Sequence, residues 1–133
     1  GYDSKTINQY YYNSSNKNPE SESDSWIEFD FGKRKINMTS YTIRTDNDGP
    51  NSYYSPKSWR IVGSNDNQNW NVINRQANRS ELNGNYKQHR FECAKSNNYY
   101  RYIRYIQEDS WNSLYFRYIF SLTCFEIFGA FLE

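Results

Sequence analysis

The side chains best suited to binding a ligand lie in residues 45–55, TDNDGPNSYYS, a long connection without apolar periodicity. Connections of this size in a compact β domain often carry function. Carboxylates and amides can accept hydrogen bonds from sugar hydroxyls, and an aromatic face can stack on the C–H groups of a sugar ring. The candidates in this connection are Asp46, Asp48, Asn51, Tyr53 and Tyr54. In the alternative interpretation, the two tyrosines only pin the connection to the rest of the domain.

A second candidate connection is QEDSWN, residues 107–112, in which Trp111 is the large side chain expected to be exposed. Asp109 and Asn112 would add polar groups beside it. Trp111 can equally serve as a plug that closes one end of the domain. A further aromatic cluster, which includes Tyr11 and Tyr12, lies in a polar N-terminal segment rich in Asn and Ser.

Catalysis finds little support in the sequence. General acid–base chemistry needs titratable groups with perturbed pKa values, and the one histidine, His89, falls within an expected strand. Cys93 shares a face with His89, but four residues of strand span about 13 Å, so the two cannot form a thiol–imidazole dyad. The sequence contains no Gly-rich phosphate loop, no serine nucleophile elbow and no C-x-x-C metal motif. We therefore expect a binding domain without a cofactor and not an enzyme.

The composition predicts a single all-β domain over residues 1–133. A chain of 133 residues is long enough for one domain with a real core. Only 36% of the residues are hydrophobic while 20% are aromatic, so large rings must fill the interior, and aromatic residues favour strands. The net charge of +1 provides no field that would steer the protein to nucleic acid. The sequence also lacks the run of about 18 apolar residues that an integral membrane segment needs.

Alternating apolar residues predict strands between residues 26 and 129, after a loop-rich segment at 1–25. Residues 56–70, PKSWRIVGSNDNQNW, are typical of a hairpin, in which a polar turn precedes a buried Trp70. The pair Asn83 and Gly84 is a second hairpin-type signal.

Residues 99–106 are expected to form a central strand that carries Arg101 and Arg104 among tyrosines. Such a pattern also occurs on surfaces that stack nucleic-acid bases. No other basic patch joins these two arginines, so we expect them to lie over aromatic rings of the domain.

Four stretches, taken in order, resemble the coagulation factor 5/8 type C, or discoidin, domain family. They are WIEFDFG (residues 26–32), the hairpin with GSND followed by Trp70, YYRYIRY (99–105) and FEIFG (125–129). The resemblance implies a jelly-roll β-sandwich of the galactose-binding type, with its ligand site on loops at one end. It also implies that residues 45–55, the 107–112 loop and the Tyr11–Tyr12 region share that end as one concave patch.

The resemblance raises one metal hypothesis and sets two departures beside it. Some carbohydrate-binding members hold a structural calcium with a glutamate on the last strand, and Glu126 matches that position. Their acidic N-terminal loop has no clear counterpart here. Galactose-binding members use a His and an Arg in the ligand loops, and neither residue is present in the corresponding loops of this chain.

The two cysteines, Cys93 and Cys124, bear on the compartment. Many secreted members of the discoidin family tie the ends of the domain with a disulfide, and this chain has no cysteine before residue 93 to take part. We expect both to be buried small hydrophobic side chains, with a bridge between them left open. The sequence leaves localisation open, with the cytoplasm favoured over the extracellular space.

Two binding functions remain. The first is an interaction or adaptor domain that docks a protein partner, which the unpaired cysteines and the Asn-rich, polar character favour. The alternative is a lectin-like module whose loop tips bind a glycan, which the Tyr, Trp, Asn and Asp content of the loops favours. Phospholipid binding is disfavoured because it calls for apolar loop tips with basic neighbours, whereas these loops are polar and acidic.

Overall fold

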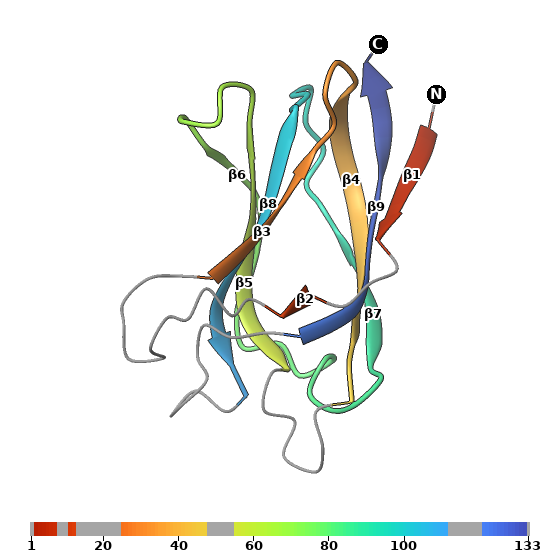
Figure 1. Ribbon diagram of the computed structural model, residues 1–133, viewed down its shortest axis with the longest axis vertical. Helices are drawn as coiled ribbons and strands as arrows, with labels where there is room; N and C mark the ends of the chain where they lie inside the picture. The colour runs from red at the N-terminus through yellow and green to blue at the C-terminus, as the bar shows by residue number, and fades with distance from the viewer. Residues whose placement is uncertain (1, 8–10, 13–24, 48–54, 112–120, 133) are drawn as a thin grey trace.

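The computed structural model describes residues 2–7, 11–12, 25–47, 55–111 and 121–132, and within these ranges every regular element is a β-strand. The strands form two antiparallel sheets that face each other (Figure 1). The all-β jelly-roll sandwich expected from the sequence is therefore confirmed. No helix in the described part of the chain is long and apolar enough to cross a membrane.

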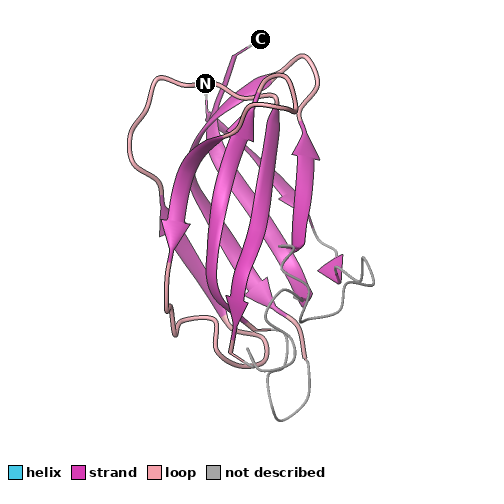
Figure 2. Ribbon diagram, turned by 90° about the vertical axis from the view of Figure 1, so that its left-hand side faces the viewer, coloured by secondary structure: helices cyan, strands magenta, loops and turns pink. Residues whose placement is uncertain are grey.

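The five-stranded sheet has the order β1 (Tyr2–Ile7), β9 (Ser121–Leu132), β4 (Lys35–Thr45) and β7 (Gln88–Glu92), with the short β2 (Tyr11–Tyr12) also paired to β9. The four-stranded sheet has the order β3 (Ser25–Asp30), β8 (Tyr102–Ser110), β5 (Pro56–Ser64) and β6 (Asn71–Gln76). From β3 onward, each connection except that between β5 and β6 passes from one sheet to the other. These connections therefore gather at the ends of the sandwich (Figure 2).

Large aromatic rings fill the space between the sheets, as the composition predicted. Trp59, Tyr41, Tyr105 and Phe125 are each at most 1% exposed. Phe125 stacks on Tyr41 at a ring-centroid distance of 5.6 Å, and Trp59 meets the ring of Phe91 edge-on at 5.0 Å. Burial of such rings, together with their mutual contacts, supplies much of the free energy that holds the two sheets together.

The polar atoms of the central rings are satisfied inside the core. The Trp59 indole Nε1 donates to the Tyr41 hydroxyl at 2.8 Å, and that hydroxyl donates to Asn74 Oδ1 at 2.6 Å. Burial raises the pKa of Tyr41 well above its ordinary value. An unpaired buried polar group would cost about 1–3 kcal/mol, so this chain of hydrogen bonds is what allows two polar rings to occupy the centre.

The β5–β6 hairpin forms where the sequence predicted it. In its turn Asp66 accepts hydrogen bonds from the backbone N–H and the side-chain amide of Asn69, and these bonds hold the pKa of Asp66 well below its ordinary value. Asn67 adopts a left-handed φ of 59°, a conformation that asparagine tolerates better than most residues. The expectation that Trp70 is buried in the core was wrong. It lies half-exposed on the outer face of the sheet, with the Arg104 guanidinium over its ring.

Three other expectations need correction. Residues 1–25 were expected to be rich in loops, but Tyr2–Ile7 forms β1, which pairs with β9 along its whole length. Residues 107–110 were expected in a loop but belong to β8, because Gln107 pairs with both Ser25 and Trp59 and its fully buried amide oxygen accepts the Tyr105 hydroxyl. Residues 77–87 do not form a hairpin turn around Gly84, because β6 pairs with β5 whereas β7 pairs with β4 in the other sheet.

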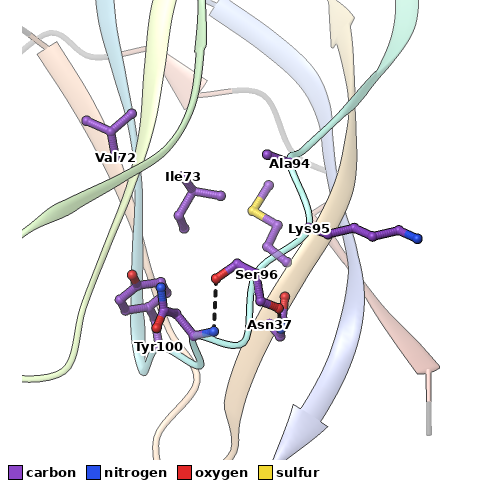
Figure 3. A pocket seen from close by; sticks show the side chains of 9 residues that line it. Asn37, Val72, Ile73, Ala94, Lys95, Ser96 and Tyr100 are labelled. Atoms are coloured by element: carbon purple, nitrogen blue, oxygen red, sulfur yellow. Dashed lines mark hydrogen bonds between the residues drawn. The ribbon is translucent and has the colours of Figure 1, made fainter.

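A shallow cleft opens on the side of the sandwich, between β6 and the irregular segment 94–98 (Figure 3). It has a volume of about 130 Å³, and Met38, Ile73 and Tyr100 line it together with polar side chains of the segment. The segment is held by the Asn37 side-chain amide, which donates to the Ser96 carbonyl. None of the ligand candidates that the structure describes lines this cleft.

Candidate ligand-binding end of the sandwich

One end of the sandwich gathers the strand ends that flank the predicted ligand loops. At this end β4 stops at Thr45, β5 starts at Pro56, β8 stops at Ser110 and β9 starts at Ser121. The pairing of Pro56 with Ser110 and of Thr45 with Leu122 brings these strand ends together. The backbone of β2 joins them, because Tyr11 and Tyr12 pair with Leu122 and Ser121. We call this the loop end, and it is the lower end in Figure 2.

Residues 77–87, which the sequence did not assign to the ligand site, brace the loop end. The fully buried Thr45 hydroxyl donates to the Gly84 carbonyl at 2.7 Å and accepts the Lys87 N–H at 2.9 Å. The Ser55 hydroxyl lies 3.3 Å from both the carbonyl oxygen and the amide nitrogen of Gly84. Gly84 has a φ of 140°, which side-chain-bearing residues rarely adopt. The one sequence signal for this brace is Leu82, an isolated apolar residue that proves to be fully buried.

Trp111 is fixed in place and half-buried at the loop end. Its backbone N–H donates to the Ser55 carbonyl at 3.0 Å, and its indole Nε1 donates to the Arg79 carbonyl at 3.1 Å. The Lys57 ammonium lies 4.9 Å from the ring centroid. Because the indole N–H bonds within the protein, the ring surface is what Trp111 can offer a ligand.

The carboxylates predicted for the site are only partly placed. Asp46 is half-exposed at the end of β4, where its Oδ1 accepts the Asn47 N–H at 2.8 Å. Asp109 lies within β8, and its Oδ1 accepts the Ser110 N–H at 2.9 Å. The remaining candidates, Asp48, Asn51, Tyr53, Tyr54 and Asn112, lie outside the described residues, as do the side chains of Tyr11 and Tyr12.

Sequence reasoning missed a second ring beside these groups. Tyr86 is 53% exposed and precedes Lys87, whose backbone N–H bonds to Thr45. Its φ of 54° is left-handed, and the Arg44 guanidinium lies 5.1 Å from its ring centroid. The only sequence sign was an aromatic residue within a polar turn. The loop end therefore presents two rings, each with a cation beside it.

The titratable groups near this end form a structural ion pair and not a catalytic set. The Arg79 guanidinium hydrogen-bonds to the Glu81 carboxylate and lowers the pKa of Glu81 to about 2. His89 Nε2 lies 3.8 Å from the same carboxylate, and its ring packs on Phe91 at 4.8 Å between ring centroids. Burial raises the pKa of the Cys93 thiol to about 12, which makes it a poor nucleophile.

The two cysteines are free and lie far apart along β4. The Cys93 N–H donates to the Thr39 carbonyl, whereas Cys124 lies opposite Arg44, five residues further along the strand. Five strand residues span about 16 Å, and a disulfide needs its Cα atoms within about 7 Å. Both thiols are half-buried, and Cys93 packs against the hydrophobic core.

The calcium hypothesis stays a prediction. Glu126 lies in the middle of β9, opposite Thr42 of β4 and Thr6 of β1. Across residues 2–7, 11–12, 25–47, 55–111 and 121–132, no three His, Cys, Asp or Glu residues cluster in a way that could hold a metal ion.

This architecture defines a class: a jelly-roll β-sandwich domain whose loops converge at one end. The F5/8 type C domain model matches residues 2–118, and the chain belongs to this family. The resemblance seen in the sequence is thereby confirmed. No curated protein sequence matches the chain significantly.

Several solved structures share the fold at low sequence identity. CpGH89CBM32-5 from Clostridium perfringens, in complex with GalNAc-β-1,3-galactose, has a TM-score of 0.62 and 10% identity, over 97% of this chain and 95% of that one. The C-terminal domain of a chitobiase from Bacteroides fragilis has a TM-score of 0.63 and 16% identity, over 85% and 68%. CBM62 from Clostridium thermocellum Xyl5A has a TM-score of 0.58 and 16% identity, over 85% and 73%.

Proposed function

We propose that this domain is a non-catalytic module that binds a carbohydrate at its loop end. The observation that carries the proposal is the presence at that end of the fixed Trp111 ring, the exposed Tyr86 ring and the Asp46 carboxylate. Rings offer a flat apolar surface to the C–H face of a sugar, and a carboxylate accepts hydrogen bonds from its hydroxyls. Sites of this kind work best when the side chains are already held in place, as the two hydrogen bonds of Trp111 hold it.

The similar structures support a sugar over a protein partner. One of them is bound to GalNAc-β-1,3-galactose, and the names of others mark them as modules of glycoside hydrolases. Their relation to this chain is distant, so they support the ligand class and not the particular sugar. The first hypothesis from the sequence, a protein-docking adaptor, gains no support from these structures, and the lectin-like alternative fits them better. Membership of the F5/8 type C family likewise favours binding over catalysis.

A glycan-array screen of the domain tests the proposal. The screen is run in calcium and again with a chelator, on the wild type, Tyr86→Ala, Trp111→Ala and the control Leu132→Ser. Leu132 is 51% exposed and pairs with Lys35, at the end of β9 opposite the loop end. Its replacement therefore removes a comparable apolar surface away from the proposed site.

The expected result is selective binding that both ring variants weaken and the control keeps. Loss of binding in the presence of the chelator would show that glycan binding depends on a calcium ion. A blank array for the folded, monomeric wild type would refute the carbohydrate proposal and direct attention to protein partners.

A further inference from the structure

The outer face of the four-stranded sheet carries a layered stack of side chains centred on Arg104, which lies six residues along β8 from its end at Ser110. The Arg104 guanidinium carbon lies 3.9 Å from the ring centroid of Trp26 and 4.1 Å from that of Trp70. Trp26 is on β3 and Trp70 directly precedes β6, which are the two edge strands of the sheet, while Arg104 is on the central β8. The guanidinium is therefore held between two indoles that approach it from opposite sides.

The register of the sheet places these residues on one continuous surface. Glu28, Arg104, Val62 and Val72 stand directly opposite one another on successive strands and so share one face. Ile106 and Val62 point to this outer face but are only 8% and 4% exposed, because the larger side chains cover them. Trp26 itself stays 42% exposed. The face is thus a packed layer with an indole on its surface.

Hydrogen bonds fix the orientation of the stack. Arg104 Nε donates to Glu28 Oε1 at 2.8 Å, and its Nη2 donates to Asn67 Oδ1 at 3.0 Å in the β5–β6 turn. The side chains of Arg104 and Glu28 are only 20% and 23% exposed. A cation between two aromatic faces is stabilised by both, so the rings keep their positions before any ligand arrives.

The charges of the face are paired within the protein. Arg101 donates a hydrogen bond to Asp30 at 2.9 Å. The Glu108 carboxylate forms ion pairs with both Arg60 and Arg75, at 2.8 and 2.7 Å. Among the described residues of this face, four arginines thus meet three carboxylates, which leaves no cluster of uncompensated charge that would select an acidic or basic ligand. Their remaining N–H donors and carboxylate lone pairs can still exchange hydrogen bonds with hydroxyl groups.

The size of the face also narrows the choice of ligand. Four strands span three inter-strand spacings, about 14 Å, and six residues of strand are about 20 Å long, so the flat extent of the face is about 280 Å². A stable protein interface covers about 800 Å² on each partner. One exposed indole among fixed polar groups matches the apolar face and the hydroxyl rim of a neutral sugar ring. We propose that this sheet face is a second carbohydrate-binding surface, distinct from the loop end, with Trp26 as its stacking platform.

The tryptophans of the chain make both sites observable in one experiment. There are four, and their indole N–H groups give separate signals in a ¹H–¹⁵N spectrum. Trp111 reports on the loop end, Trp26 and Trp70 report on the sheet face, and the fully buried Trp59 reports on the core. The probes are GalNAc-β-1,3-galactose and the linear β-1,3- and β-1,4-linked glucose hexasaccharides.

We expect at least one hexasaccharide to shift the Trp26 and Trp70 signals in a saturable manner, with the Trp59 signal unchanged. The same shifts should persist in Trp111→Ala, which impairs the loop end only. Trp26→Ala should weaken this binding about tenfold, the loss expected for one aromatic contact, while Trp26→Phe and Leu132→Ser should retain it.

Two results would overturn the proposal. In one, no probe moves the Trp26 and Trp70 signals, whatever happens at Trp111; the loop-end function could then still hold. In the other, Trp26→Ala abolishes self-association of the domain without altering any glycan shift, which would assign the face to a protein contact.

Discussion

Replacement of Thr45 by valine should remove the hydrogen bonds that hold residues 77–87 at the loop end while leaving the packing of the strands intact. Valine keeps the shape of the fully buried side chain but removes the hydroxyl that donates to Gly84 at 2.7 Å and accepts from Lys87 at 2.9 Å. Each such bond contributes about 1 kcal/mol net, so the two together predict a loss of about 2 kcal/mol in the free energy of unfolding. With a urea m-value of about 1.5 kcal/mol/M, the unfolding midpoint should fall by about 1.3 M.

The matched control is Thr39→Val on the same strand. Thr39 is half-buried and makes one long hydrogen bond, 3.3 Å to the Phe128 carbonyl, so its replacement should cost about 0.5 kcal/mol, or about 0.3 M in the urea midpoint. Urea denaturation followed by tryptophan fluorescence measures both variants. Thr45→Val should also weaken glycan binding at the loop end, while Thr39→Val should not. Equal midpoint shifts in the two variants would show that the Thr45 hydroxyl does not hold the brace.

Three further outcomes follow from particular contacts. Gly63→Ala should lower the free energy of unfolding by about 2 kcal/mol in thermal denaturation, because an added Cβ would lie 2.5 Å from the Tyr100 ring; an unchanged melting temperature would contradict this contact. At pH 8 iodoacetamide should modify Cys93 about 100-fold or more slowly in the native protein than in urea, since a pKa of about 12 leaves almost no thiolate; comparable rates would show that the thiol is not buried. The pKa of Glu81 is lowered from 4.5 to about 2, so the pair with Arg79 stabilises the fold above about pH 4.5 and its contribution is lost as the pH falls towards 2; the stability difference between wild type and Glu81→Gln should shrink over that range, and a pH-independent difference would refute the pair.

Local patterns in the chain predicted much of the strand structure from β3 onward, but not β1 or the last residues of β8. The alternation of Ile27 and Phe29 against Glu28 puts the first two in the core and the third on the outer face, as observed. The hairpin of β5 and β6 formed at its polar turn, as expected. Such features depend on residues two to six positions apart, so their side-chain types and backbone preferences can be read directly from the local sequence.

The candidate site was predictable only in part. That residues 45–55 and Trp111 share one end is a prediction from the family resemblance. The structure describes residues 45–47, Ser55 and Trp111 of this set, and the Trp111 N–H donates to the Ser55 carbonyl. The Tyr86 ring and the brace of residues 77–87 were missed because nothing in their local sequence distinguishes a docked turn from a solvated one. Their role arises from hydrogen bonds between Gly84 and residues about 30 to 40 positions earlier.

The same limit explains why Trp70 was misassigned and Trp59 was not. Trp59 lies on β5 and Trp70 directly precedes the neighbouring β6, and the pattern of apolar residues favours burial for each. Trp59 is buried because its side chain points towards the other sheet, where the Tyr41 hydroxyl accepts a hydrogen bond from the indole N–H. Trp70 remains on the surface because Arg104, 34 positions later in the chain, reaches its ring across β5. Strand identity was thus encoded by short-range pattern, while the partner of each aromatic ring was decided by long-range strand order, which no local stretch of sequence contains.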